Sequence, residues 1–280
     1  MATGLDFVDE EAIRRTVEEI AQENLVFREA FRDIDASGIN NSKLTVPDPE
    51  DALASPQALD PGQEYPEARD SYRTVDIERV KYGNLMSIPM EDQMDHAPGD
   101  LIDQQVDRHA REMAEFLDEN AYVELESAVT DAADGGPSSG DGDGVLDYDD
   151  AVDAMTTLED RGFEPDICFV SPLAKKDLLT DENFTRASDG GDEVVFNGQF
   201  GEVAGVPFSY SNTGDLAAPG DEDEPAAIMV DTDLFGYEAT WTPIETETDD
   251  SFNTDEDQVK IRTLKGWKAI KEDAVVGIDA

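Results

Sequence analysis

The stretch that decides the fold is DLIDQQVDRHAREMAEFLDENAYVELESAVT, residues 100–130. Apolar residues recur in it at steps of three and four, which is the spacing of one face of an α-helix. This stripe consists of Ile102, Val106, Ala110, Met113, Leu117, Ala121, Leu125 and Ala128. A helix of about 30 residues is roughly 45 Å long, which exceeds the usual length in globular proteins. The sequence therefore predicts one dominant helix.

The residues before this helix predict three further segments. Apolar positions at helical spacing predict a helix over 9–36, ended by Ser37-Gly38. The stretch 46–72 is polar and rich in proline, so we expect an exposed arm or loop there. The runs 72–80 and 84–90 predict two strands, and the Gly-Asn pair at 83–84 suits a tight turn between them.

The residues after the long helix predict a mixture of helices and strands. A glycine-rich stretch over 134–144 precedes a helix at 148–161, a buried strand at 167–170 and a short helix that begins at Pro172. Four later segments favour strands, namely 202–211, 226–231, 236–247 and 258–270. Cys168 lies in the apolar run ICFV, which indicates a buried thiol. The predicted fold class is α+β.

The charge is extreme for a chain whose hydrophobic content is ordinary. There are 68 acidic and 20 basic residues among 280, which gives a net charge of −48 at pH 7. The acids are spread along the chain rather than gathered in a tail. Low lysine and abundant aspartate are typical of proteins from salt-in halophiles, where the Debye length falls to about 3 Å at 1 M salt. We therefore expect a protein adapted to high salt.

Basic residues gather in one place only. Residues 260–271 contain Lys260, Arg262, Lys265, Lys268 and Lys271, and these alternate with apolar residues. This alternation favours a strand with a charged face whose partners are acidic neighbours. Binding of nucleic acid by a basic patch is excluded, because such binding needs clustered cations on an exposed surface. No apolar run reaches the ~20 residues that span a membrane, and no secretory signal opens the chain.

Motifs for catalysis are missing from the sequence. His96 and His109 are the only histidines, and His109 lies near the apolar stripe of the long helix, which indicates a packed side chain. Phosphate-binding loops, nucleophile elbows and zinc-binding helix motifs do not occur. The sequence therefore predicts a protein that is not an enzyme and needs no cofactor.

The stretch SSGDGDGVLDYDD, residues 138–150, has two interpretations. Counted from Ser139, its oxygen ligands follow the spacing of a calcium loop, with Asp141, Asp143, Asp147 and Asp150 as candidate metal ligands. Position 1 is Ser rather than Asp, and position 12 is Asp rather than Glu. Alternatively the glycines form a hinge and Asp147 caps the next helix, with Asp149 and Asp150 in its first turn. We favour the hinge and leave structural cations at this loop as an alternative.

The order of the segments resembles that of a known family. It is carried by the stretches 75–125, 146–179 and 200–212, of which the last reads FGEVAGVPFSYSN, and by 227–247 and 259–278. Together they resemble the major capsid proteins of tailed double-stranded DNA viruses with the Hong Kong 97 fold. The resemblance implies an N-terminal arm (1–46), an E-loop (47–95), a P-domain with a spine helix (96–145), an A-domain (146–261) and a closing P-domain strand (262–280).

The resemblance also implies a function. We expect a structural protein of the virion, made in the host cytoplasm, that self-assembles into hexamers and pentamers of an icosahedral shell around DNA. The charge favours a virus of a haloarchaeon, with portal or decoration proteins as further partners and no membrane. Some relatives crosslink through a lysine of the E-loop, but no lysine lies between Lys43 and Lys81, so we expect non-covalent shells. The alternatives are an encapsulin-like nanocompartment and a calcium-binding surface protein that uses residues 139–150.

Overall fold

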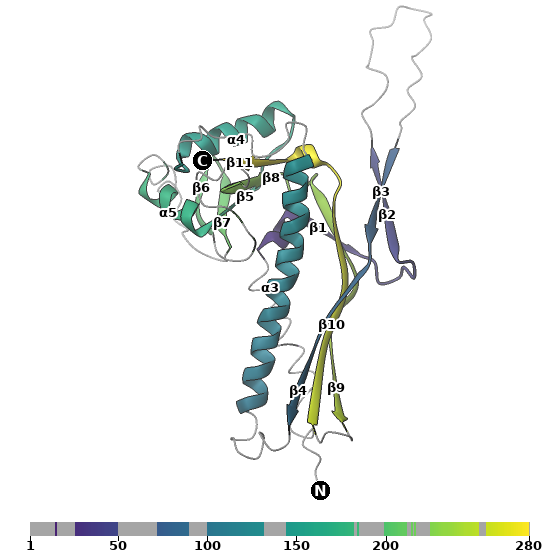
Figure 1. The fold of residues 1–280 in the computed structure, drawn as a ribbon. Helices are drawn as coiled ribbons and strands as arrows, with labels where there is room; N and C mark the ends of the chain where they lie inside the picture. Colours follow the sequence, from purple (N-terminus) through teal and green to yellow (C-terminus); the bar gives the residue numbers. More distant parts are fainter. Residues whose placement is uncertain are drawn as a thin grey trace, which may run out of the picture.

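The structure is a computed structural model, and it describes residues 15, 26–49, 72–89, 100–131, 144–181, 184, 199–211, 214, 216, 225–251 and 256–279. Within these residues one long helix lies between two sheets, and a separate two-stranded ribbon stands to one side (Figure 1). We refer to the long sheet with the helix as the helix–sheet unit. The other sheet, with its two covering helices, is the five-stranded unit.

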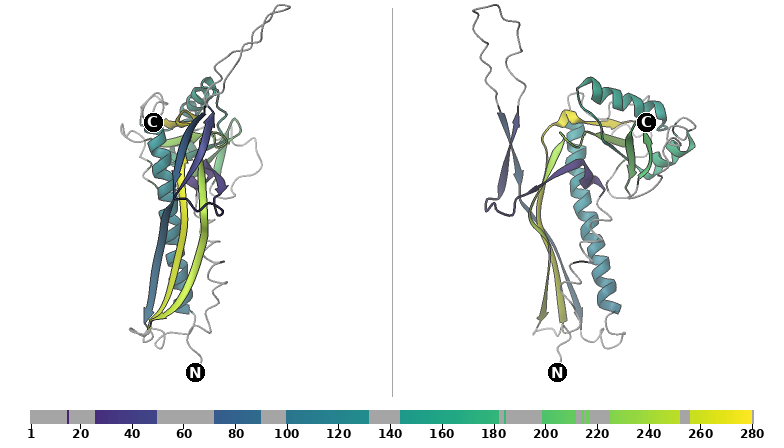
Figure 2. Two further views of the ribbon diagram at one scale, coloured as in Figure 1. Left: turned by 90° about the vertical axis from the view of Figure 1, so that its right-hand side faces the viewer. Right: turned by 180° about the vertical axis from the view of Figure 1, so that it is seen from behind.

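The long helix α3 spans Asp100–Asp131 and confirms the central prediction. It runs along the length of β4, β9 and β10 (Figures 1 and 2). Seven residues of the predicted stripe are buried, namely Val106, Ala110, Met113, Leu117, Ala121, Leu125 and Ala128; the side chain of Ile102 lies outside the described part. The first half of the stripe packs on the long sheet and the second half on the five-stranded sheet. α3 therefore joins the two sheets through one apolar face.

The long sheet has the order β1-β9-β10-β4. Its strands are β1 (Phe31–Asp35), β9 (Gly236–Ser251), β10 (Glu256–Ala269) and β4 (Val80–Pro89). β10 runs antiparallel to β9 and β4, while β1 runs parallel to β9. The register of β9 on β10 shifts beside Pro243, as expected where proline cannot donate a ladder hydrogen bond.

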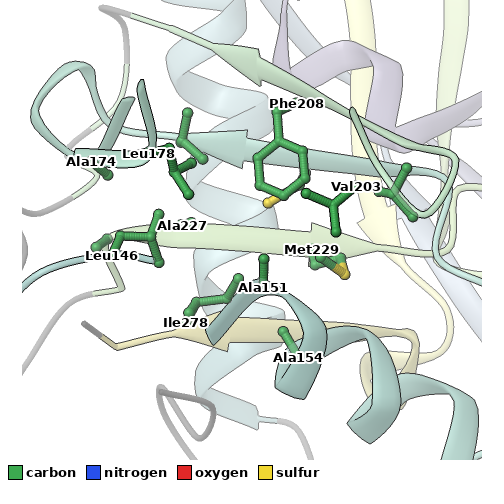
Figure 3. Close-up of a cluster of buried hydrophobic side chains, with 14 of the residues drawn as sticks. Leu146, Ala151, Ala154, Ala174, Leu178, Val203, Phe208, Ala227, Met229 and Ile278 are labelled. Atoms are coloured by element: carbon green, nitrogen blue, oxygen red, sulfur yellow. The ribbon is translucent and has the colours of Figure 1, made fainter. Parts of the chain in front are cut away.

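The five-stranded sheet has the order β11-β8-β5-β7-β6. Its strands are β11 (Val275–Ile278), β8 (Ala227–Val230), β5 (Ile167–Val170), β7 (Val206–Tyr210) and β6 (Gln199–Val203). Helices α4 (Tyr148–Asp160) and α5 (Pro172–Thr180) contribute to the apolar cluster on one face of the sheet (Figure 3). β5, β8 and β11 are buried along their whole length, which explains their continuous apolar sequences.

Four short elements complete the described part of the chain. β2 (Lys43–Pro49) and β3 (Tyr72–Glu78) form the antiparallel ribbon. The 3-10 turns η2 (Phe27–Ala30) and η3 (Glu272–Ala274) precede β1 and β11. The ribbon lies on the opposite side of the long sheet from the five-stranded unit (Figure 1). The predicted loop over 46–72 is wrong at its ends, since residues 46–49 belong to β2 and Tyr72 begins β3; residues 50–71 lie outside the described part.

The predicted helix over 9–36 is wrong in its described C-terminal part. Residues Phe27–Ala30 form η2, and Phe31–Asp35 form strand β1. β1 completes the edge of the long sheet beside β9, and the ring of Phe31 lies 5.1 Å from that of Phe235. Helical spacing of a few apolar residues is a weak preference, and these pairing and packing contacts override it.

The predicted turn at Gly83-Asn84 is also wrong. Both residues lie inside β4, and β3 and β4 pair with different strands rather than with each other. A Cβ at Gly83 would lie 3.1 Å from the carbonyl oxygen of Ile261 on β10. Gly83 therefore allows β4 and β10 to approach closely. From the sequence alone, a glycine at such a contact looks the same as a glycine in a turn.

Strand pairing departs from the expected segment boundaries. β9, expected within the A-domain at 146–261, belongs to the long sheet. β11, expected in the closing P-domain strand at 262–280, belongs to the five-stranded sheet. The chain leaves the five-stranded sheet after β8, forms β9 and β10, and returns for β11.

Candidate assembly surfaces

A groove lies between α3, β10 and the junction of β3 with β4. Its volume is about 450 Å³, and its lining includes Glu78, Val80, Tyr82, Val123, Trp267 and Lys268. Val80 and Val123 are 43% and 56% exposed, so the groove offers apolar surface to solvent. The indole N–H of Trp267 is buried and has no acceptor within the described part of the chain. Such a surface is typical of a contact site rather than of a reaction centre.

The apolar strip continues along α3 beyond the groove. Phe116 is exposed one turn before Asn120, and its ring meets Tyr82 edge-on with 5.8 Å between the ring centres. Asn120 donates a hydrogen bond to the carbonyl of Phe116. Phe116, Asn120 and Val123 follow helical spacing on the side of α3 that is not buried, so α3 has a second, solvent-facing apolar strip.

The face of the long sheet opposite α3 carries paired charges. Lys260 and Glu247 are direct cross-strand partners and form an ion pair. Arg262 pairs with Glu245 at 3.0 Å and with Glu247 at 2.7 Å. Opposite charges on adjacent strands stabilise a sheet modestly. The prediction that the basic residues of 260–271 meet acidic neighbours is confirmed for these residues and for Lys268, which pairs with Glu124.

Lys265 departs from the predicted charged face. It lies on the same side of β10 as Ile261 and Thr263, and its side chain is only 7% exposed. Its ammonium contacts Glu238, whose carboxylate is fully buried. The guanidinium of Arg28 binds the other oxygen of Glu238. Two cations thus compensate one buried carboxylate where η2, β9 and β10 meet, as a charge without water requires.

A second buried carboxylate, Asp118 of α3, has no cation beside it within the described residues. One oxygen accepts a hydrogen bond from the amide of Phe27 at 2.8 Å, and the other has no partner within the described residues. Burial raises the pKa of Asp118 to about 7, against the opposing effect of the amides of residues 26–28 and of Ser211. Asp118 thus holds η2 against α3.

Gly266 and Arg73 hold the two ends of strand β3 against the long sheet. A Cβ at Gly266 of β10 would lie 2.1 Å from the carbonyl oxygen of Glu78, so β3 crosses β10 where no side chain fits. Arg73 of β3 donates to the carbonyl of Ile270 at 3.1 Å and pairs with Asp48 of β2. These contacts tie the ribbon to the upper end of the long sheet.

Of the four candidate cation ligands, the structure describes Asp147 and Asp150. Asp141 and Asp143 lie outside the described residues. Asp147 is the N-cap of α4 and accepts from the amides of Asp149 and Asp150, while Asp150 accepts from the amide of Asp147. This capping box confirms the N-cap prediction. In the described part of the chain no three His, Cys, Asp or Glu residues are placed to hold a metal ion.

Two further sequence predictions can be compared with the structure. His109 is packed against β4, as the sequence predicted. Its Nδ1 lies 2.7 Å from the side-chain amide nitrogen, Nδ2, of Asn84. Cys168 is fully buried, and burial raises the pKa of its thiol well above the ordinary value. Among the described residues, no helix combines the length and the apolar character needed to cross a membrane.

Sequence reasoning missed Glu238 and Asp118. Each is one acid among 68 in the chain, so its residue type carries no signal. Asp118 lies one position after Leu117 of the apolar stripe, and this position indicates partial burial. Because acidic residues are frequent along the whole helix, the sequence does not distinguish Asp118 from the exposed acids. Glu238 lies at an alternating position of a strand between apolar neighbours, and only the pairing with β10 brings Lys265 to it.

The chain matches known proteins in sequence and in fold. Residues 72–278 match the family model described as phage capsid protein. The major capsid protein of Staphylococcus phage phiMR11 is 36% identical over 61 residues, which are 21% of this chain and 22% of that protein. The shared segment therefore covers only about a fifth of the length of that relative.

Solved capsid structures share the fold at low sequence identity. The capsid structure of Cyanophage P-SCSP1u aligns with a TM-score of 0.68 and 15% identity, over 91% of this chain and 88% of that one. The capsid of Ralstonia phage GP4 gives 0.66 and 14%, over 91% and 90%. The mature capsid of bacteriophage PhiM1 gives 0.64 and 14%, over 91% and 87%.

Proposed function

Because the chain belongs to the phage capsid protein family, we propose that it is a major capsid protein that polymerises into hexamers and pentamers of an icosahedral shell. The observation that carries the proposal is the family match over residues 72–278, together with a fold shared over 91% of the chain. The division into N-arm, E-loop, spine-helix P-domain and A-domain of the Hong Kong 97 type belongs to this proposal. The comparisons favour this role over an encapsulin-like compartment and over a calcium-binding surface protein.

The shape of the molecule supports assembly through neighbouring copies. The ribbon packs on the long sheet through Ile77 of β3, on the side away from the five-stranded unit (Figure 2), and a two-stranded ribbon alone is marginally stable. In the proposed shell the ribbon of β2 and β3 lies against an adjacent subunit. The groove beside Val123 and the apolar strip of α3 would be covered by a neighbouring copy, which removes their apolar surface from water.

The proposed shell encloses double-stranded DNA without binding it through a basic patch. The described cations of β10 are already engaged by Glu247, Glu245, Glu238 and Glu124. An acidic wall would confine DNA through intervening counter-ions rather than through direct phosphate contacts. Portal or decoration proteins would be the further partners in the virion.

The proposal includes assembly in high salt, because we propose that the virus infects a haloarchaeon. Copies that each carry −48 repel one another strongly unless salt screens the charge. Sedimentation velocity of the purified chain from about 0.1 M to about 3 M KCl tests this. We expect shell-sized particles at high salt and slow, dissociated material at low salt. Slow sedimentation at every salt concentration would contradict the assembly, and assembly unaffected by dilution would contradict the salt adaptation.

The proposed shells are held together without covalent links. Lys43, the lysine nearest the loop, is engaged by Glu78 at 2.7 Å on the ribbon, and no lysine follows it until Lys81. Denaturing electrophoresis of boiled particles should give one band at the monomer mass, 30.6 kDa. A ladder of multimers would show that a crosslink forms.

A further inference from the structure

Helix α5 presents an apolar and basic face to solvent. Ala174 and Leu178 are buried beneath the helix, whereas Leu173 and Leu179 on its outer side are 55% and 50% exposed. Lys176 lies between the two leucines with 75% of its side chain exposed, and its ammonium is 3.6 Å from the carboxylate of its neighbour Asp177. We call Leu173, Lys176 and Leu179 the α5 face.

The α5 face is held in place by contacts at each end of the helix. The hydroxyl of Ser171 accepts from the amide of Ala174 and caps the first turn. The ammonium of Lys175 lies 3.2 Å from the centre of the Tyr210 ring on β7. At the far end, Asp181 accepts from the amide of Tyr148 at the start of α4. A rigid helix that exposes two leucines is typical of a contact surface, because ordering the surface costs little further entropy.

Helix α4 presents the opposite charge. It contains five acidic and no basic residues, and Asp149, Asp153, Glu159 and Asp160 are exposed. Asp153 and Asp160 are seven positions apart, so they lie on the same side of the helix. α4 and α5 lie at separate places on the five-stranded unit (Figures 1 and 2), so one copy offers both surfaces at once.

We propose that the α5 face docks against the acidic side of α4 in a second copy of this chain. Pairing α5 with α5 would place Lys176 beside Lys176, whereas pairing α5 with α4 places each lysine beside aspartates. A contact between two different faces repeats from copy to copy and closes into a ring when the rotation allows it. Half-buried Val152, beside Asp153 on α4, supplies apolar surface at the edge of the acidic side. This inference rests on the proposed self-assembly and specifies one of its contacts.

Charge exchange tests the contact. At the lowest salt concentration that still supports assembly, where screening is weakest, Lys176→Glu should raise the concentration needed for assembly at least about tenfold, because it sets like charges against each other. The double change Asp153→Lys with Asp160→Lys should also weaken assembly. Combining all three changes should restore assembly to near the wild-type concentration. Arg111→Glu, at an exposed position of α3 outside the groove and outside the apolar strip, makes the same change of charge and is the control that should leave assembly unchanged.

Light scattering and electron microscopy measure assembly, and circular dichroism confirms that each variant is folded. Leu173→Ser with Leu179→Ser provides a second, uncharged disruption of the α5 face. If the wild type assembles and both α5 variants assemble equally well, the inference is wrong while the proposed function stands. If Lys176→Glu disrupts assembly but the triple variant does not recover, α4 is not the partner surface. If the wild type itself never assembles, the proposed function fails instead.

Discussion

The five-stranded sheet is buried on both faces by apolar side chains, whereas the long sheet packs α3 on one face and rows of paired charges on the other. Buried charged side chains also differ between the units in what surrounds them. Glu238, Lys265 and Asp118 are buried in the helix–sheet unit, whereas the buried acids of the five-stranded unit, Asp150 and Asp231, accept hydrogen bonds from backbone amides at the ends of its elements. The five-stranded unit is thus stabilised mainly by apolar burial, and the helix–sheet unit also depends on how its charges are compensated.

The two buried carboxylates of the helix–sheet unit are compensated differently. Glu238 has Arg28 and Lys265, while Asp118 has amide hydrogen bonds and a pKa near neutrality. Both hold the segment that contains η2. Four variants test this contrast between the units.

The largest effect is expected in the five-stranded core. Phe208 is fully buried and meets Phe184 edge-on at 5.5 Å, so Phe208→Ala should lower the free energy of unfolding by about 3–5 kcal/mol. Denaturant unfolding of the dissociated chain, at two salt concentrations that both keep it folded, measures this loss. The loss should be nearly the same in both, because it arises from a cavity. A loss that changes strongly with salt would contradict the view that the five-stranded unit is stabilised mainly by apolar burial.

Asp118→Asn should change how stability depends on pH. The folded-state pKa of Asp118 lies above its unfolded value, so the folded protein binds the proton more tightly between pH 4 and pH 7 and loses stability as pH rises through this window. The Asn variant lacks this loss, while all other acids are common to both proteins. The stability difference in favour of Asn should therefore grow by up to about 4 kcal/mol from pH 4 to pH 8. A difference independent of pH would show that Asp118 stays ionised.

Lys265→Met should cost about 3 kcal/mol, because Glu238 would remain buried with only Arg28 beside it. Adding Glu238→Gln should recover more than half of that loss. Arg108→Ala is the matched control, since its pair with Glu112 is exposed on α3 and is expected to contribute only about 0.3 kcal/mol. Equal losses for Lys265→Met and Arg108→Ala would mean that burial of the pair is unimportant.

Gly266→Ala should cost about 2 kcal/mol, because the added Cβ would meet the carbonyl oxygen of Glu78 and push the ribbon away from β10. Gly38→Ala is its control, since a Cβ there has nothing within 4 Å. Thermal unfolding compares the two variants. Similar transitions for both would indicate that the ribbon does not cross β10 closely.

The sequence predicted the elements that repeat a strong local pattern. The stripe of α3, the capping aspartate Asp147 and the apolar runs of β5 and β8 were each recognisable because burial and spacing agree there. β1 and the interior of β4 were mispredicted because their conformation depends on strands more than 100 residues away in the chain. The groove beside Val123 could not be predicted, since residues from β3, β4, α3 and β10 meet there only in the folded chain.

The central claim is that copies of this chain close into a shell. Cryo-electron microscopy of the purified wild-type chain in molar salt tests it most directly. The account predicts closed particles whose map contains five- and six-fold rings of this fold, with α3 and the long sheet in the shell wall and the ribbon on a neighbouring subunit. Dispersed monomers at every salt concentration, or particles whose subunits lack these contacts between copies, would contradict it.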